Sequence, residues 1–555
     1  MARLAFDWLH SYERKWLSSD VIAGLTASAV VIPKSLAYAT VAGLPVEAGL
    51  YTALVPAAIY AVLGSSRPLS VSTTTTLAIL TGAALQPMAA TGDQAALLAA
   101  AATLALLVGV ILMLAGALRL GFVANFISEP VLVGFKAGIG IVIVLDQIPK
   151  LIGTHIEKAS FFHNLAATVA SIPHASWLTA ALGGITILIL LSSEHFWPRA
   201  PAPLVAVALG VGALWLFGLE KLGVSTVGQV PTGLPSVSLP NWHLIEALWP
   251  AATGIALMSF TESIAAGRAF SRLGESLPQP NRELLATGLA NLGGAWFGAM
   301  PAGGGTSQTA VNRLAGARSQ LAGLITAGIA LATLLLLAPL IGLLPNASLA
   351  AIVIVYSVGL IDPKEFRAIA RVRNTEFLWA LVALIGVMVI GTLQGIVVAI
   401  IVSLLALAYQ VSDPPVHALG RKPGSNIFRP RSAAHREDEF FVGVLIVRPE
   451  GRIFFANAER VRQKIEALVD EAWPKVVILD LSRVFDLEYT ALKVLTEAEQ
   501  RQRELGVNVW LVGLNPSVWK MVKRSPLGEA LGTARTAFNV EQALDRAGIH
   551  LTRKP

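Results

Sequence analysis

Long stretches without a charged residue constrain this chain more than any other feature. Intervals free of Asp, Glu, Lys and Arg run between residues 67 and 93, 93 and 119, 199 and 220, 283 and 313, 318 and 362, and 376 and 413. A helix needs about 20 apolar residues to cross a bilayer, so several of these intervals can hold one span or two. We therefore expect a membrane domain of about 400 residues, enough for roughly a dozen or more helices.

Composition excludes several classes of function. Only 14% of the 555 residues are charged, whereas soluble proteins carry about a quarter, which argues against a soluble multidomain enzyme. The chain has no cysteine, so disulfides, thiolate zinc sites and cysteine nucleophiles are excluded. The histidines lie outside the apolar runs, and we expect no enzyme activity, no metal and no cofactor. The net charge of +7 fits Lys and Arg retained on the cytoplasmic side of a membrane rather than binding to nucleic acid.

The character of the chain changes near residue 412. Residues 1–19 carry several charges and lack the features of a signal peptide, so we expect a cytoplasmic N-terminal segment. A transmembrane domain is expected over 20–411, a linker rich in Pro, Arg and Lys over 412–437, and a soluble domain over 438–555. In the soluble domain strands alternate with helices, which predicts a small α/β fold with a largely parallel sheet. The expected strands cover 441–447, 476–481 and 507–512, and the expected helices cover 458–472, 490–505 and 540–547.

Two polar runs interrupt the apolar segments, one in each half of the membrane domain. Ser70–Thr76 precedes a short apolar segment at 77–85, and Pro301–Thr309 precedes another at 310–317. In lipid, irregular backbone is tolerated only where it is buried in protein or lines a cavity, and matching breaks in two halves indicate a transport site. Each run should start a half-helix whose free N–H groups and positive dipole end face a cavity, which suits an anion. The alternative is that Gly, Ser and Thr simply allow close helix packing.

Ionisable residues inside apolar helices are costly and indicate function. Glu262 is one, and we expect it to bind and release a proton or to join a cation site; the alternative is a structural ion pair. Lys34 is another, either an anion ligand, the partner of Glu262, or a lysine that reaches to the membrane surface. Lys136 and Asp146 on a further helix are interpreted as a structural or interface pair rather than as a site. The expected substrate-binding residues are Lys34, Ser72, Thr73, Thr74, Thr75, Gly305, Thr306, Ser307 and Gln308.

Several segments resemble the SulP family of sulfate permeases and related anion transporters. They are Asp20–Thr26 with Ile32–Pro33, Ala37–Ala39, Ala42–Pro45 and Gly49–Tyr51, then Leu63–Val71, Val227–Pro235, and Thr309–Asn312 with Ala315–Gly323. The resemblance implies two inverted repeats of seven helices, about 20–220 and 246–411, which form core and gate domains that work by an elevator mechanism. It also implies a cytoplasmic STAS domain after Asp438, a homodimer, and a multi-pass protein of the cell membrane.

The sequence departs from the family pattern at the expected site. The family's Gln after the first-helix proline is Lys34 here, and the arginine of its tenth helix is Gln308. We therefore expect Lys34 to supply the positive charge that Gln308 lacks. Glu262 matches the acidic position that resembles the proton-coupled members. Tyr489 stands where related STAS proteins carry a phosphoserine, so we expect no such switch.

The expected function is secondary transport of a small inorganic anion, most of all sulfate, coupled to protons. The alternatives are a bicarbonate or dicarboxylate carrier coupled to sodium or protons, and an uncoupled anion exchanger. A membrane sensor or scaffold that acts through a partner of the STAS domain is the alternative from another class. The basic residues between 421 and 436 could touch anionic lipid, although residues retained on the cytoplasmic side explain them as well.

Overall fold

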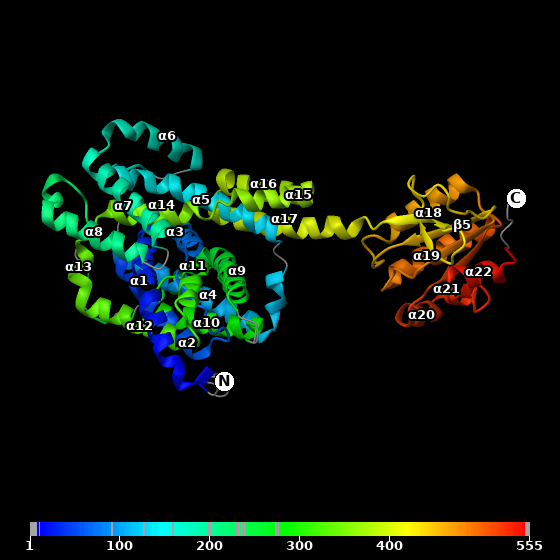
Figure 1. Ribbon diagram of the computed structural model, residues 1–555, viewed down its shortest axis with the longest axis horizontal. Coiled ribbons are helices and arrows are strands. Elements are labelled where there is room, and N and C mark those ends of the chain that lie inside the picture. Colours follow the sequence, from blue (N-terminus) through cyan, green and yellow to red (C-terminus); the bar gives the residue numbers. More distant parts are fainter. Residues whose placement is uncertain are drawn as a thin grey trace. The chain divides into compact units, whose positions relative to one another are not determined.

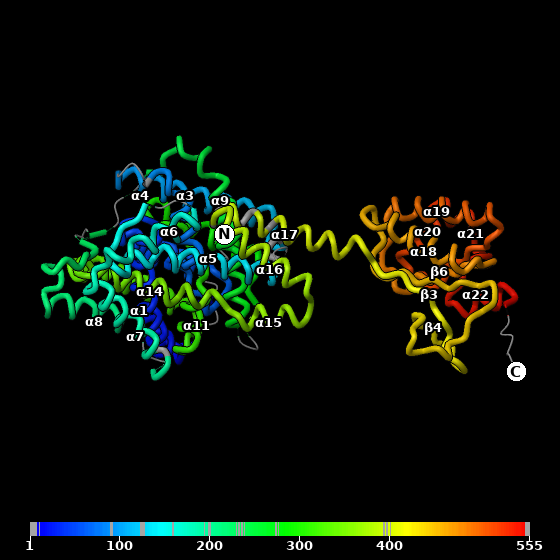
Figure 2. Tube along the Cα trace, turned by 90° about the horizontal axis from the view of Figure 1, so that it is seen from above, coloured from blue at the N-terminus to red at the C-terminus, as the bar shows by residue number. Residues whose placement is uncertain are grey.

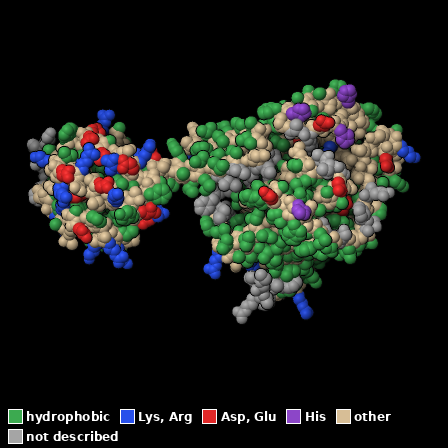
Figure 3. Space-filling model, turned by 180° about the vertical axis from the view of Figure 1, so that it is seen from behind, with side chains coloured by type: hydrophobic (Ala, Val, Ile, Leu, Met, Phe, Trp, Pro, Cys, Tyr) green, Lys and Arg blue, Asp and Glu red, His purple; other side chains and the backbone are tan. Residues whose placement is uncertain are grey.

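The computed structural model describes residues 8–9, 12–89, 93–125, 128–157, 160–197, 201–228, 230, 233–234, 237, 239–271, 275 and 277–549. The chain divides into two compact units, Met1–Leu404 and Leu405–Pro555. Hydrophobic side chains cover much of the visible face of the first unit, whereas Lys, Arg, Asp and Glu gather over the second (Figure 3). This contrast agrees with a membrane part and a soluble part.

Helices make up most of the first unit, as the charge-free intervals predict. They are α1 (Leu17–Val41), α2 (Val46–Leu63), α3 (Thr75–Ala89), α4 (Gln94–Ala117), α5 (Glu129–Ile152), α6 (Phe161–Ser171), α7 (Trp177–Phe196), α8 (Ala202–Phe217), α9 (Ile245–Ala269), α10 (Pro280–Trp296), α11 (Thr306–Leu314), α12 (Leu321–Ala332), α13 (Ala338–Gly342), α14 (Asn346–Val358), α15 (Pro363–Val372), α16 (Asn374–Ile390) and α17 (Thr392–Ser412). Among the described residues, seven helical stretches are long and apolar enough to span a bilayer, or eight if the bent pair of α6 and α7 counts as one span. The mainly helical, polytopic fold class is confirmed.

The order of elements occurs twice along the chain. In the first half α1 and α2 are followed by the two-residue strand β1 (Val71–Ser72) and the helix α3. In the second half α9 and α10 are followed by β2 (Gly303–Gly304) and the short helix α11. Because α3 and α11 begin within the membrane unit after irregular backbone, they do not count as full spans. Other apolar helices of the membrane unit, such as α8 and α16, are also shorter than a full span.

The helices of the first unit pack into two bundles. The first bundle is α1–α4 with α9–α12, where α4 packs on α9 and α10, and α12 packs on α1 and α2. The second bundle contains α5, α7, α8, α14 and α16, where α5 packs on α14 and α16. In Figure 1, α5, α14 and α16 lie together above α4, α9 and α10. Glycine allows the closest approach in the second bundle, because a Cβ on Gly134 would lie 1.9 Å from the carbonyl oxygen of Ala380.

The second unit is an α/β domain with a six-stranded sheet in the order β4-β3-β5-β6-β7-β8, and β5 to β8 run parallel. Its elements are β3 (Val416–Arg421), β4 (Phe428–Pro430), β5 (Val444–Pro449), α18 (Ala458–Ala472), β6 (Val476–Asp480), α19 (Tyr489–Glu504), β7 (Asn508–Val512), α20 (Pro516–Lys523), α21 (Pro526–Leu531), β8 (Thr536–Ala537) and α22 (Val540–Arg546). Helices α18 to α21 cover one face of the sheet and α22 covers the other (Figure 2). Alternate strand residues serve the two faces, since Leu445 packs toward α18 and Ile446 toward α22.

The segment expected to be a linker is corrected by the structure. Within 412–437, strand β3 pairs antiparallel with β5, and β4 pairs with β3, so both belong to the sheet. Arg429, expected to be a basic linker residue, instead binds the carboxylate of Asp438 through Nε at 3.0 Å. Strand β4, at the edge of the sheet, is only three residues long and contains Arg and Pro, and β3 ends in Gly and Arg. This composition is why the sequence pattern indicated a linker.

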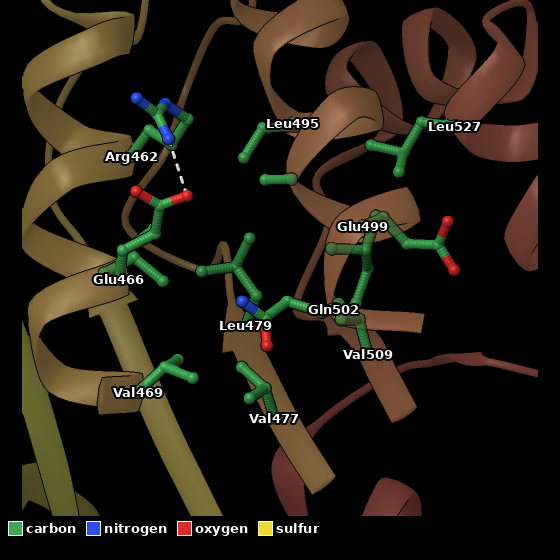
Figure 4. Close-up of a pocket in the computed structure, with 13 residues that line it drawn as sticks. Arg462, Glu466, Val469, Val477, Leu479, Leu495, Glu499, Gln502, Val509 and Leu527 are labelled. Atoms are coloured by element: carbon green, nitrogen blue, oxygen red, sulfur yellow. Dashed lines mark hydrogen bonds and ion pairs between the residues drawn. The ribbon is translucent and has the colours of Figure 1, made fainter. Parts of the chain in front are cut away.

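An apolar cavity of about 50 Å³ lies between α18, α19 and the sheet of the second unit (Figure 4). Val469, Val477, Leu495 and Val509 line it, and the side chain of Gln502 lies next to Leu479 (Figure 4). The core of this domain is therefore incompletely filled.

Candidate functional site

The two half-helices begin side by side at the paired strands. Val71 pairs with Gly304 and Ser72 with Gly303, and the backbone N–H of Gly305 donates to the carbonyl oxygen of Ser70 at 3.1 Å. From this point the helices diverge. A Cβ on Gly82 of α3 would lie 3.0 Å from the carbonyl oxygen of Val41, at the C-terminal end of α1.

The second half-helix runs the other way, because a Cβ on Gly316, just beyond α11, would lie 3.9 Å from Ser19, at the start of α1. The N-termini of α3 and α11 therefore face each other between the two ends of α1. The two helices begin at Thr75 and Thr306, within the polar runs that the sequence predicts to start them. The hydroxyl-rich runs thus lie within or next to the first helical turns.

Glycine at both β2 positions lets this strand pack against α9. A Cβ on Gly303 would lie 2.8 Å from Ser259 Oγ, and one on Gly304 would lie 2.8 Å from the Cα of Ser263. The hydroxyl of Ser259 donates to the carbonyl oxygen of Ala302 at 2.7 Å, and Ser263 Oγ accepts from the N–H of Gly304 at 2.7 Å. These bonds fix the start of α11 against α9.

Lys34 lies at the N-terminus of α11. Its side chain is 3% exposed, and Nζ donates to Ser307 Oγ at 3.0 Å. The same ammonium lies 3.4 Å from the centre of the Tyr356 ring on α14, a cation–π contact between the two bundles. The structure therefore brings Lys34 to one of the two helix ends where the sequence predicts anion binding.

The remaining predicted ligands differ in what their side chains already bind. Ser72 Oγ donates to Gln308 Oε1 at 2.9 Å, and Gln308 Nε2 donates to the carbonyl oxygen of Ser70 at 3.2 Å. Both ends of the Gln308 amide are thus used to hold β1 against α11. Thr75 Oγ1 donates to the hydroxyl of Tyr38 at 2.8 Å, which ties α3 to α1.

Polar groups with unused bonding capacity are also present. Thr73 Oγ1 is buried and has no hydrogen-bond partner among the described residues. Such an orphaned hydroxyl is costly unless it meets a ligand or water. Thr306 and Ser307 are exposed, so the site is not sealed from its surroundings.

Glu262 of α9 lies at the N-terminus of α3. Thr74 Oγ1 donates to Glu262 Oε2 at 2.8 Å and accepts from the N–H of Leu77 at 3.2 Å, so Thr74 caps the helix while it holds the carboxyl group. The hydroxyl of Thr76 is also hydrogen-bonded to this carboxyl group. The predicted coupling residue and the predicted anion ligands thus share one helix end.

The interpretation of Lys136 and Asp146 as a pair is wrong. Ten residues separate them on α5, which places them about 15 Å apart along the helix. Asp146 instead accepts a hydrogen bond from Asn164 Nδ2 at 3.2 Å and lines a cavity of about 510 Å³ at the far end of α3. Lys150, one turn further along α5, lines the same cavity and donates to the carbonyl oxygen of Thr40 at 3.0 Å.

Two residues at the site were not singled out from the sequence. Tyr38 lies one helical turn after Lys34 on α1, so helical spacing could have revealed it. Tyr356 carries no such signal, because only packing of the two bundles brings it to the start of α11. Within the described part of the chain, no group of three or more His, Asp or Glu side chains could hold a metal ion.

Comparison with known proteins agrees with this arrangement. Residues 17–383 match the family described as "Sulfate permease family", and residues 435–543 match the STAS domain. A "Probable sulfate transporter" of Mycobacterium tuberculosis is 35% identical over 532 residues, which cover 94% of this chain and 93% of that protein. "Probable sulfate transporter 3.4" of Arabidopsis thaliana is 31% identical over 564 residues, covering 97% and 86%.

Two solved structures share the fold. The murine Slc26a9 anion transporter in the inward-facing state aligns with a TM-score of 0.90 at 22% identity, covering 98% of this chain and 94% of that one. The transmembrane domain of the cyanobacterial bicarbonate transporter BicA aligns with a TM-score of 0.59 at 24% identity, covering 71% and 98%. With a family match over most of its membrane unit and relatives above 30% identity along nearly its whole length, the chain belongs to the sulfate permease family.

Proposed function

We propose that this protein is a proton-coupled transporter of a small inorganic oxyanion, most of all sulfate, which binds between the N-termini of α3 and α11. The observation that carries the proposal is the meeting of these two helix ends with the buried ammonium of Lys34 at one and the carboxyl group of Glu262 at the other. The ligands of the anion and Glu262, the group that couples transport to a proton, then lie at the same pair of helix ends.

The charge at the site suits a divalent anion. Each helix N-terminus is equivalent to roughly half a positive charge, so the two ends amount to about one, and Lys34 adds another. Backbone N–H groups of the first turns, the orphaned hydroxyl of Thr73, and the hydroxyls of Thr306 and Ser307 provide hydrogen bonds. Lys34 takes the part that an arginine at Gln308 would otherwise play, because Gln308 is uncharged and holds β1.

Proton coupling follows from Glu262 lying at the same helix end as the anion. An ionised carboxylate there repels a second anion, whereas a protonated one does not. Binding of a proton to Glu262 and binding of the anion at α3 therefore favour each other, as linkage requires. In the elevator mechanism the first bundle carries the site and moves against the second bundle, because both half-helices, Lys34 and Glu262 belong to the first.

The proposal also covers location and assembly. It places the protein in the cell membrane as a homodimer, with residues 1–19 and the STAS domain on the cytoplasmic side, where a partner protein could bind the latter. The relatives named as sulfate transporters along nearly the whole chain support the choice of anion.

Uptake by purified protein in liposomes tests the function. Labelled sulfate should accumulate faster under an inward proton gradient, and Glu262→Gln should make uptake independent of pH. Transport of bicarbonate or fumarate in place of sulfate, or dependence on a sodium gradient, would favour the corresponding alternative carrier. If no anion crosses the liposome membrane, the alternative function of a membrane sensor or scaffold is favoured. A protein truncated after residue 438 should still bind sulfate if the membrane unit is the transporter.

A further inference from the structure

Tyr356 on α14 joins the second bundle to the predicted anion site. The ammonium of Lys34 lies 3.4 Å from the centre of the Tyr356 ring, and its Nζ donates to Ser307 Oγ at 3.0 Å. Lys34 belongs to α1 and Ser307 to α11, both in the first bundle, whereas α14 packs on α5 and α7 of the second. One ammonium therefore contacts the start of a half-helix and a side chain of the opposite bundle at the same time.

The helix that carries Tyr356 is held within the second bundle at both of its ends. A Cβ on Gly140 of α5 would lie 2.7 Å from the carbonyl oxygen of Ser357, the next residue along α14. Near the other end of α14, Ser348 Oγ is hydrogen-bonded to Thr186 Oγ1 of α7 at 3.2 Å. The ring of Tyr356 therefore stays with the second bundle if the two bundles move relative to each other.

An aromatic ring suits the ammonium of an anion ligand better than a carboxylate would. The face of the ring attracts a cation through its quadrupole and has no net charge, so the positive charge of Lys34 stays available to a bound anion. A carboxylate in the same place would cancel that charge. Lys34 is only 3% exposed, and cation–π contacts are strongest when the cation is desolvated. Because lysine has a flexible four-carbon stem, a contact in addition to Ser307 restricts where the ammonium lies.

We propose that Tyr356 positions the ammonium of Lys34 at the N-terminus of α11 in the bundle arrangement seen here, and thereby gives this arrangement the higher affinity for the anion. The inference rests on the proposed function, in which Lys34 is an anion ligand and the first bundle moves against the second. That movement takes Lys34 and Ser307 away from Tyr356. Anion binding and the contact with Tyr356 then favour each other by linkage, and loss of the contact on movement helps the anion to dissociate.

Dissociation constants for sulfate, measured by calorimetry on the purified full chain, test the positioning role. Tyr356→Leu removes the ring and should weaken sulfate binding about fivefold, which is within the range expected for a cation–π contact. Tyr356→Phe keeps the ring and should restore binding to within about twofold of the unchanged protein. In the background of Lys34→Met, Tyr356→Leu should have no further effect, because the ring then has no cation to hold.

Phe377→Leu is the matched control. Phe377 of α16 is a partly buried ring of the same bundle, and it packs on Phe366 of α15 with ring centres 6.3 Å apart. Its removal should leave the affinity for sulfate unchanged. If Tyr356→Leu does not fold, Tyr356→Met occupies a similar volume without a ring and serves instead.

Sulfate exchange in proteoliposomes tests the link to the arrangement of the bundles. Because Tyr356 contacts Lys34 in one arrangement and not in the other, Tyr356→Leu should change the ratio of the half-saturating sulfate concentrations on the two sides of the membrane by about fivefold. An unchanged ratio overturns this link.

Three results of the binding measurements overturn the positioning role alone. They are an unchanged dissociation constant in Tyr356→Leu, an equal loss of affinity in Phe377→Leu, and an equal loss in the background of Lys34→Met. If Tyr356→Phe binds sulfate as weakly as Tyr356→Leu, the contact through the ring is likewise overturned. Absence of sulfate binding by the unchanged protein overturns the proposed function as well.

Discussion

Replacement of Lys34 by methionine tests the anion site most directly. Lys34 Nζ lies 3.0 Å from Ser307 Oγ at the start of α11, so an anion bound at this helix end would lie about 4 Å from the ammonium. At an effective dielectric constant near 20, that separation gives about 4 kcal/mol for each unit of anion charge. Desolvation of the ammonium offsets part of this, and deletion of one partner of a buried charge pair costs about 2–5 kcal/mol.

We therefore expect Lys34→Met to weaken sulfate binding by about 3 kcal/mol, or roughly 100-fold. Because the Coulomb energy scales with the charge of the anion, nitrate should lose about half as much free energy. Lys34→Arg keeps the charge and should stay within about tenfold of the unchanged protein. Dissociation constants from calorimetry on purified protein measure all three.

The pattern of losses decides between a ligand and a structural lysine. If the binding of sulfate and of nitrate loses the same free energy, or if neither loses any, Lys34 is not an electrostatic ligand.

A second experiment restores the positive charge at another position. Lys34→Ala combined with Gln308→Arg should recover part of the uptake that Lys34→Ala loses. The recovery should be incomplete, because arginine at 308 sacrifices the bonds to Ser72 and Ser70. No recovery at all would argue against compensation between the two positions.

Three further predictions concern packing and the second unit. Gly304→Ala should abolish sulfate uptake, because its Cβ would meet the Cα of Ser263 at 2.8 Å, whereas Gly328→Ala, with nothing within 4 Å, should transport normally. In the isolated second unit, Val477→Ile adds a methylene next to the cavity of about 50 Å³ (Figure 4). This variant should raise the free energy of unfolding, measured in urea, by about 1 kcal/mol. Val512→Ile, in the packed core on the other face of the sheet, should not raise it. The hydrogen bond from Arg429 lowers the pKa of Asp438 in the folded domain. The ion pair therefore contributes to the unfolding free energy at pH values above the unfolded-state pKa of about 4. This contribution is lost as the pH falls through the lowered pKa of the folded state. Asp438→Asn should make the unfolding free energy depend less on pH between 5 and 2; an unchanged acid dependence would contradict this role of the ion pair.

Much of the fold could be predicted from local features of the sequence. The charge-free intervals indicated the membrane helices because lipid accepts few charges, and the hydroxyl-rich and glycine-rich runs marked both half-helices. Both helices begin within these runs, at Thr75 and Thr306. Strands β3 and β4 were missed because both are short and lie in a segment rich in Pro, Arg and Lys.

The contacts within the site were less accessible. Lys34 and Glu262 could be recognised as costly charges, yet their neighbours depend on residues far away in the chain. Lys34 contacts Ser307 and Tyr356, and the carboxyl group of Glu262 accepts a hydrogen bond from Thr74. No spacing within one helix predicts these partners.

The pairing of β1 with β2 has a consequence for measurements from the two sides of the membrane. Two residues from each repeat join the half-helices directly, and the bonds of Ser70, Ser72 and Gln308 lock the joint. In a transporter that works as proposed, this joint keeps the shell of ligands from the first bundle unchanged while the bundle moves. Sulfate should then bind with similar affinity from inside and outside. Any difference between the two affinities would arise from groups on the second bundle, such as Tyr356, which contacts Lys34.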